Sequence, residues 1–252
     1  MRLPRSVISL LILTAFACKP TTEAKLTLAV AANMQYAMSE IAKAFTDETK
    51  IKCDLITGSS GKLTAQIREG APYDVFLSAN MKYPMELFKN GLTTAPPKTY
   101  AYGRLVLWTQ NEHIVPSLES LADNKVEHIA LANPEIAPYG RASLQILSSL
   151  NLYDTVAHKL VYAESISQTN QFISTGAAQI GFTAMSVVMS PNLKGKGRWK
   201  GLDPKYHDPV QQGIVLIKQN DGQDKSARLF FDFIFSVEAR KILEKYGYSI
   251  HE

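Results

Sequence analysis

A short apolar strand, a loop of small residues and an amphipathic helix recur along this chain of 252 residues. In the first unit, an apolar stretch at 26–32 precedes a segment whose hydrophobic residues fall at helical spacing, from Met34 to Phe45. The same analysis predicts further strands at 51–57, 74–78, 105–108, 129–132, 160–163, 179–183 and 213–217. Strands that alternate with helices in this way predict an α/β fold with mainly parallel sheets.

The end of the chain has clear helix-boundary signals. An apolar segment at 230–235 is followed by Ser236, a good N-cap for a helix over 237–246. Gly247 stands where such a helix would end. The chain is therefore expected to close on a capped helix.

The N-terminal segment has the pattern of a secretory signal. Arg2 and Arg5 precede an apolar run at 7–17 that ends in Ala-Phe-Ala. Its length is about half of the roughly 20 apolar residues that a membrane-spanning helix needs. We expect residues 1–17 to be removed on export to the periplasm or cell exterior; the alternative is a buried first strand or helix.

The two cysteines indicate no disulfide framework. Cys18 follows the expected cleavage site and loosely fits a bacterial lipobox, so membrane anchoring through a lipidated Cys18 and simple cleavage both stay open. Cys53 lies in an apolar alternation, which suggests a small buried hydrophobe. One or no partner thiol also excludes a metal site built on cysteines.

Composition excludes several classes of protein. Hydrophobic residues make up 46% of the chain and charged residues 20%, which is ordinary for a globular protein and excludes disorder. Loss of Arg2 and Arg5 would lower the formal net charge from +4 to +2, too little to indicate nucleic-acid binding. The length allows one large domain or two smaller ones.

Four of the strand-to-helix junctions are candidate ligand sites: Asn33, Ser60, Tyr139 and Ile166. Ligands of open parallel sheets gather beyond the carboxyl ends of the strands, where helix N-termini favour an anion. Ser60, between a serine and a glycine, offers a hydroxyl donor where the backbone can approach closely. The simpler alternative is that Ser60 and Asn33 only cap their helices.

Nucleotide binding and catalysis are not supported by the motifs. The segment 58–62 lacks a phosphate-loop pattern, because Ile56 stands where that loop needs glycine and Leu63 where it needs serine or threonine. Lys62 is then a solvated charge beside the loop. None of the four junctions contains a histidine, and the chain has no nucleophile-elbow or zinc-protease motif. We therefore expect a binding protein rather than an enzyme.

Five motifs in order resemble the molybdate-binding proteins of ABC importers. They are LAVAAN at 28–33, GSSGKL at 58–63, GAPYDVFLSA at 70–79, NPEIAPYG at 133–140 and YGY at 246–248. The resemblance covers nearly all of the chain after the expected signal. It implies a two-lobed periplasmic-binding-protein-like fold of type II, with the ligand in the cleft between the lobes. Lobe I would comprise residues 25–102 and 208–252, and lobe II residues 103–207, with hinges at the two crossings.

The resemblance also implies which residues bind the anion. The family's two serines fall on Asn33, whose backbone N–H and amide would donate, and on Ser60, whose hydroxyl and N–H would donate. Its two backbone donors fall on Tyr139 and Ile166. Many members carry a further tyrosine where this chain has Ala184, so we hypothesise that the Tyr139 hydroxyl substitutes and that Tyr139→Phe loses affinity. The alternative is that the Tyr139 ring packs between the lobes.

The implied ligand is molybdate, and tungstate as well, held as a dianion by six or seven neutral donors without lysine or arginine. No cofactor and no bare metal ion is expected, since molybdenum would arrive as the oxyanion. The expected partner is an ABC permease in the inner membrane, and the protein is expected to be a monomer that does not bind nucleic acid. Two alternatives are a receptor of the same fold for another oxyanion, such as sulfate, and an exported enzyme.

Overall fold

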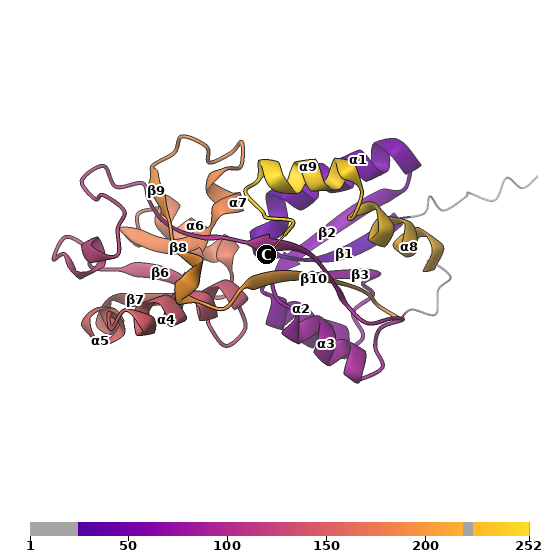
Figure 1. The fold of residues 1–252 in the computed structure, drawn as a ribbon, viewed down its shortest axis with the longest axis horizontal. Coiled ribbons are helices and arrows are strands. Elements are labelled where there is room, and N and C mark those ends of the chain that lie inside the picture. The colour runs from indigo at the N-terminus through magenta and orange to yellow at the C-terminus, as the bar shows by residue number, and fades with distance from the viewer. Residues whose placement is uncertain (1–24, 219–223, 252) are drawn as a thin grey trace, which may run out of the picture.

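The computed structural model describes residues 25–218 and 224–251. The expected signal peptide at 1–17 and Cys18 therefore lie outside the described residues. Within them the chain forms two five-stranded sheets, side by side along the long axis of the molecule (Figure 1). Each sheet has helices on its faces, so the expected α/β fold with two lobes is confirmed. We call the halves built on the first and second sheets lobe I and lobe II.

Lobe I has the strand order β2-β1-β3-β10-β4. The strands are β1 Lys25–Ala31, β2 Lys52–Gly58, β3 Val75–Ser78, β4 Lys98–Gly103 and β10 Val210–Leu216. The helices are α1 Gln35–Thr49, α2 Ser60–Arg68, α3 Lys82–Lys89, α8 Asp224–Phe233 and α9 Val237–Lys245. Helices α1, α8 and α9 lie over one face of the sheet, and α2 and α3 over the other (Figure 1).

Lobe II has the strand order β7-β6-β8-β5-β9. Its strands are β5 Leu105–Thr109, β6 Ile129–Ala132, β7 Leu160–Ala163, β8 Ile180–Ala184 and β9 Arg198–Gly201. Its helices are α4 Pro138–Ser149, α5 Tyr153–Val156, α6 Ile166–Ser174 and α7 Met185–Val188. Short 3₁₀ turns lie at Ala32–Met34, Glu119–Ala122, Ala157–Lys159 and Pro204–Tyr206.

The sheets are mixed rather than mainly parallel. Strands β1, β2 and β3 pair in parallel, as do β6, β7 and β8, which are the βα units that the sequence pattern predicts. Strands β10 and β5 pair antiparallel with both of their neighbours. These antiparallel strands lie where the chain crosses between the lobes, from β4 to β5 and from β9 to β10.

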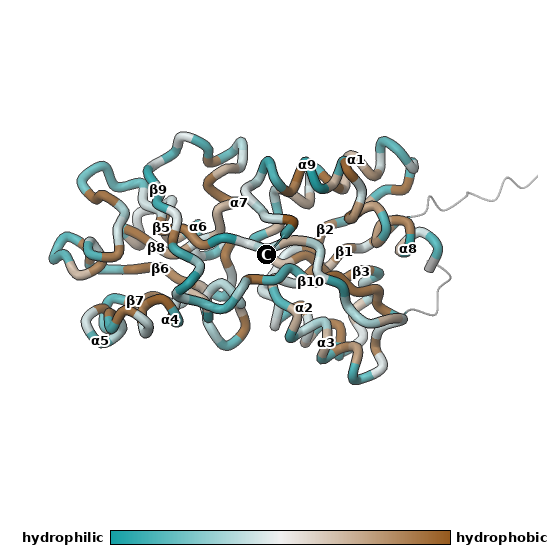
Figure 2. Tube along the Cα trace, viewed as in Figure 1, coloured by the Kyte–Doolittle hydropathy of each residue, from teal (hydrophilic) through white to brown (hydrophobic). Residues whose placement is uncertain are grey.

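Apolar clusters pack against both faces of each sheet. Figure 2 shows hydrophobic residues along the strands and helices of both halves. On one face of the first sheet, Phe45 of α1 makes edge-on contacts with Phe230 and Phe233, at centroid distances of 5.2 and 5.5 Å. Cys53 is only half-buried, and removal from water raises the pKa of its thiol to about 12, so the thiol stays protonated at neutral pH.

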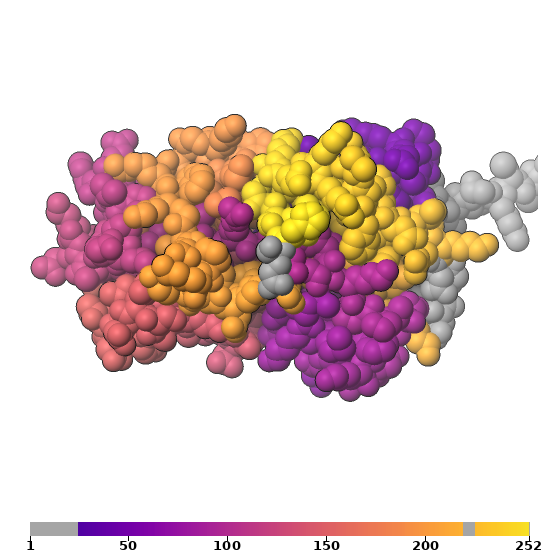
Figure 3. Space-filling model, viewed as in Figure 1, coloured from indigo at the N-terminus to yellow at the C-terminus, as the bar shows by residue number. Residues whose placement is uncertain are grey.

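The C-terminal segment returns to the crossing between the lobes. Ser236 caps α9 by accepting a hydrogen bond from the backbone N–H of Ala239, and Gly247 has a φ of +79°, as expected at the end of that helix. Ser249 then pairs with Tyr102 at the end of β4 through two backbone hydrogen bonds of 2.7 and 3.0 Å. Tyr248 Oη also lies 3.0 Å from Ser186 Oγ, which follows β8, so the segment lies against both halves of the molecule (Figure 3). That residues 25–102 with 208–252 and residues 103–207 move as separate bodies stays a prediction.

Candidate functional site

The four predicted junction residues line one small cavity between the lobes. Its volume is about 10 Å³, close to the space that one water molecule needs. Asn33, Ser60, Tyr139 and Ile166 are each at most 4% exposed. The remaining lining residues are small or apolar: Ala31, Ala32, Gly58, Ser59, Ala79, Ala137 and Pro138.

Ser60 presents a hydroxyl group that the helix does not use. The N-cap of α2 is Ser59, whose Oγ accepts from the backbone N–H of Lys62 at 3.3 Å, and Ser60 is the first helical residue. The interpretation of Ser60 as a helix cap is therefore wrong. Its Oγ accepts from the N–H of Ala79 at 3.0 Å, which leaves the hydroxyl proton available to a ligand.

Asn33 meets the cavity through its backbone. It lies in the 3₁₀ turn that precedes α1, and neither element has a side-chain cap, so the capping interpretation is wrong here too. Both amide protons are used elsewhere: Nδ2 donates to Gln212 Oε1 at 2.8 Å and to Tyr248 Oη at 2.9 Å. The amide is therefore not the free donor that we expected, whereas the backbone N–H remains one.

Tyr139 is the second residue of α4, after Pro138, which has no N–H. Its ring packs in an apolar cluster with residues of both lobes. This supports the alternative that the Tyr139 ring packs between the lobes. The hydroxyl lies against Gly103, where any side chain would collide with it, and Gly103 does not line the cavity. Among the described residues it has no hydrogen-bond partner, and burial raises its pKa well above the usual range. The hydroxyl thus does not point at the cavity.

This placement reverses the expectation for Tyr139→Phe. Removal of a buried hydroxyl without a partner costs no hydrogen bond and relieves a desolvation penalty. We expect Tyr139→Phe to bind its anion within about twofold of the wild type and to unfold at an equal or higher temperature. Titration calorimetry and thermal unfolding measure both. A tenfold loss of affinity would instead place the hydroxyl on the ligand.

Ile166 opens helix α6 on the lobe II side. Ser165 is its N-cap and accepts from the N–H of Gln168 at 3.4 Å, so Ile166 is the first helical residue, as Ser60 is in α2. A helix leaves its first N–H groups unpaired, and Ile166 can therefore contribute only that backbone group. Its apolar side chain packs in the cluster between the lobes.

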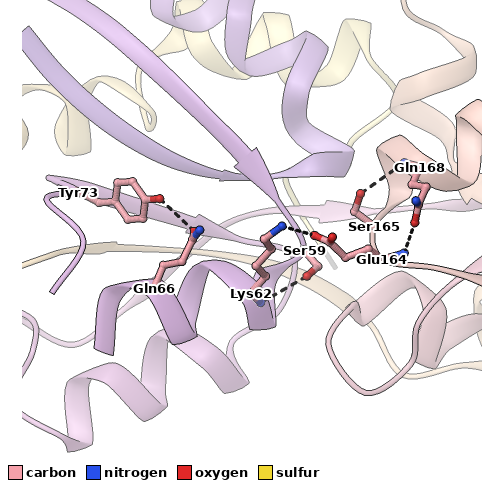
Figure 4. Close-up of polar contacts among 7 residues, drawn as sticks. All are labelled: Ser59, Lys62, Gln66, Tyr73, Glu164, Ser165 and Gln168. Atoms are coloured by element: carbon pink, nitrogen blue, oxygen red, sulfur yellow. Dashed lines mark hydrogen bonds and ion pairs between the residues drawn. The ribbon is translucent and has the colours of Figure 1, made fainter. Parts of the chain in front are cut away.

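The cavity offers donors without charged side chains. The backbone N–H groups of the four junction residues donate to no residue that the structure describes. Ser60 and Ile166 are the first residues of their helices, and Asn33 and Tyr139 the second residues of theirs, so partial positive charges converge on one point. Lys62 does not enter the cavity, because its Nζ pairs with the Glu164 carboxylate across the lobes at 2.7 Å (Figure 4). Such a lining suits a small anion.

Direct contacts close the two lobes around this cavity. The N–H of Gly61 donates to the carbonyl of Ile136 at 2.8 Å, and Tyr83 Oη donates to the carbonyl of Glu135 at 3.0 Å. On another side, Ser167 Oγ donates to Gln35 Oε1 at 3.0 Å. Sequence reasoning missed these contacts, since each joins segments far apart in the chain.

Other candidate chemistry is not found in the part of the chain that the structure describes. Within residues 25–218 and 224–251, no group of three or more His, Cys, Asp or Glu side chains is arranged to hold a metal ion. No helix in those ranges is long and apolar enough to span a membrane.

Comparison with known proteins agrees with this geometry. Residues 26–249 match the family described as bacterial extracellular solute-binding protein. The chain is 36% identical over 230 residues to the molybdate-binding protein ModA of Rhodobacter capsulatus, covering 91% of this chain and 90% of that protein. The solved periplasmic molybdate-binding protein of Azotobacter vinelandii has a TM-score of 0.85 at 33% identity, over 90% of this chain and 100% of the other. The sulfate-binding protein SubI of Mycobacterium tuberculosis H37Rv shares the fold, with a TM-score of 0.76 at 14% identity over 89% of this chain and 86% of the other.

Proposed function

Since the chain belongs to the bacterial extracellular solute-binding proteins, which bind their solutes and are not enzymes, we propose that its cavity captures molybdate or tungstate for an ABC importer. The observation that carries the proposal is the convergence of Asn33, Ser60, Tyr139 and Ile166 on one cavity without charged side chains. The names of the relatives reported above support molybdate as the ligand.

The available donors are sufficient for tight binding. Four backbone N–H groups and the Ser60 hydroxyl give five hydrogen bonds to a doubly charged acceptor. Each such bond contributes roughly 1.5–3 kcal/mol, so that five contribute about 8–15 kcal/mol. A nanomolar site needs about 12 kcal/mol. Dehydration of the dianion and closure of the lobes take up the surplus.

The same donors determine selectivity. A site that only donates hydrogen bonds disfavours protonated phosphate, because the phosphate hydroxyl would face another donor. Sulfate has the charge of molybdate but is smaller. Donors fixed at the distance of the larger anion make stretched, weaker bonds to sulfate.

Titration calorimetry of the mature protein against molybdate, tungstate, sulfate and phosphate tests the proposal. We expect one equivalent of molybdate or tungstate to bind, at least 100-fold more tightly than sulfate, with no measurable heat from phosphate. Tight sulfate binding with no response to molybdate would assign the cavity to another oxyanion. Turnover of any of these anions would point to an enzyme.

Affinity and stability depend differently on pH. No lining side chain titrates between about pH 6 and 9, so affinity for the anion should be constant over that range.

Burial raises the pKa values of Tyr100, Tyr139 and Tyr248 above that of an unfolded tyrosine. The unfolded chain loses these protons first, so the stability present below about pH 10 is lost as pH rises further. Thermal unfolding against pH checks this: a flat melting temperature up to pH 11 would contradict it.

Delivery requires a partner that recognises the loaded protein. We propose that the lobes close by bending at the crossings near Tyr102–Gly103 and His207–Pro209, and that an inner-membrane ABC permease recognises the closed form. The mature protein would act as a monomer outside the cytoplasm, free or anchored through Cys18. Mass spectrometry of the mature N-terminus distinguishes the two forms.

A further inference from the structure

A buried polar cluster lies beside the anion cavity at the crossing between the lobes. We call it the hinge cluster: Asn33, Tyr139, Ser186, Gln212 and Tyr248. Each member is at most 5% exposed. Asn33, Gln212 and Tyr248 belong to lobe I, while Tyr139 and Ser186 belong to lobe II. Only Asn33 and Tyr139 also line the cavity.

Gln212 holds the Asn33 amide from the crossing strand. Its Nε2 donates to the carbonyl of Val210 at 2.9 Å, which fixes the orientation of the amide and leaves Oε1 as an acceptor. That oxygen receives Asn33 Nδ2 at 2.8 Å. The pairing of β10 with β4 shifts register between Gln212 and Gly213. The Asn33 side chain is thus attached directly to the second crossing.

Tyr248 completes the attachment from the C-terminal segment. Its Oη accepts from Asn33 Nδ2 at 2.9 Å and lies 3.0 Å from both the Asn33 carbonyl oxygen and Ser186 Oγ. Ser186 Oγ in turn donates to the Asn33 carbonyl at 2.7 Å. Both amide protons and the carbonyl of Asn33 are therefore engaged on the side away from the cavity, partly by lobe II.

We propose that Tyr248 and Gln212 are positioning residues for the anion site, a role that rests on the proposed function. They hold the Asn33 amide out of the cavity, and the Asn33 carbonyl bonds fix the turn so that its backbone N–H faces the ligand. Without these bonds the Asn33 side chain no longer anchors the turn, and the backbone N–H can move out of line with the anion. Because Ser186 shares the same contacts, the Asn33 donor is in place only when the lobes meet.

The test uses two matched tyrosine variants. Tyr248→Phe removes the hydroxyl of the hinge cluster, whereas Tyr246→Phe removes a hydroxyl that bonds Glu40 within lobe I at 3.0 Å. Each variant loses one buried tyrosine hydroxyl group, and the two positions lie two residues apart in the same segment. We expect Tyr248→Phe to weaken molybdate binding about tenfold, through faster dissociation, and Tyr246→Phe to bind as the wild type does. Calorimetry and stopped-flow kinetics measure this. Unchanged affinity in Tyr248→Phe, or equal losses in both variants, would overturn the proposal.

The same Tyr248→Phe change, made in an Asn33→Ala variant, distinguishes an effect on the Asn33 side chain from a general effect on the structure. In Asn33→Ala there is no amide to hold, and Ser186 still donates to the backbone carbonyl of residue 33, so adding Tyr248→Phe should cost less than about twofold in affinity. A full tenfold loss in that background would mean that Tyr248 does not act through the Asn33 amide, and would contradict the proposal. Gln212→Met, which removes the other acceptor for the amide, should behave as Tyr248→Phe does and covers the case in which that variant fails to fold.

The wild-type titration comes first, because it tests the proposed ligand independently of the positioning role of Tyr248 and Gln212. If the wild type binds tungstate or sulfate instead of molybdate, the proposed ligand is wrong and the variants are compared with the anion that binds. If the wild type binds none of the four oxyanions, both proposals fail.

Discussion

Gly61→Ala is expected to weaken molybdate binding by about 10- to 100-fold while leaving the anion-free protein at least as stable as the wild type. Gly61 lies in the first turn of α2, and its N–H bonds the Ile136 carbonyl of lobe II at 2.8 Å. A Cβ atom there would lie 2.9 Å from Ile136 Cα and Cβ and 2.9 Å from Tyr83 Oη. Such overlap costs roughly 1–3 kcal/mol, and it falls on the contact between the lobes.

Gly61→Ala should impair closure of the lobes on the anion without impairing the folding of the protein. Alanine is a better helix former than glycine by about 1 kcal/mol, so the helix itself gains stability. Titration calorimetry should therefore show the loss while thermal unfolding of the anion-free protein shows none. Gly201→Ala is the matched control, since the nearest atom to its Cβ is the end of the Met185 side chain at 3.8 Å. If Gly61→Ala binds as tightly as Gly201→Ala, the lobes do not close through this contact.

Ser60→Ala is expected to weaken binding by about 10- to 150-fold, the worth of one hydrogen bond to a charged acceptor. The variant removes a hydroxyl that lines the cavity and that the cap of α2 does not use, and it leaves the buried N–H of Ala79 without its acceptor. The Ser60 backbone N–H is retained, so binding should weaken rather than disappear.

Ser59→Ala is the control for this prediction, because Ser59 is the true cap of α2. Loss of a serine cap costs about 1 kcal/mol of stability. Although Ser59 also lines the cavity, its Oγ accepts from the Lys62 N–H, and it is not among the five donors that we assign to the anion. Ser59→Ala should thus melt earlier and bind normally, while Ser60→Ala binds poorly. The opposite pattern in calorimetry and thermal unfolding would show that Ser60 serves the fold rather than the ligand.

The backbone of this site could be predicted from the sequence. Apolar strands followed by loops mark the carboxyl ends of β1, β2, β6 and β7, and the four junction positions do meet at one cavity. Local rules suffice there, because a strand and the helix after it are neighbours in the chain. For the same reason the cap at Ser236 and the stop at Gly247 agree with the structure.

The directions of the side chains could not be predicted. The Asn33 amide is held by Gln212 and Tyr248, which are 179 and 215 residues away in the sequence. Likewise the Tyr139 hydroxyl lies against Gly103, on the crossing strand. Each of these contacts depends on how the two lobes and the C-terminal segment meet, which no local pattern encodes.

Two strands were also missed for physical reasons. Strand β9 at Arg198–Gly201 is exposed along its length at the edge of its sheet, so it lacks the apolar alternation that marks a strand. Strand β4 at Lys98–Gly103 is buried only in its middle. The antiparallel additions that make both sheets mixed arise at the crossings, and they follow from the two-lobed topology rather than from any single segment.

The central claim is that uncharged donors from four helical turns hold one molybdate, and a crystal structure of the mature protein with molybdate tests it most directly. Anomalous scattering from molybdenum locates the ion without any assumption about the site. The account predicts one peak, enclosed by the backbone N–H groups of Asn33, Ser60, Tyr139 and Ile166 and by the Ser60 hydroxyl. A peak coordinated by a lysine or arginine side chain, or one outside this cavity, would contradict it.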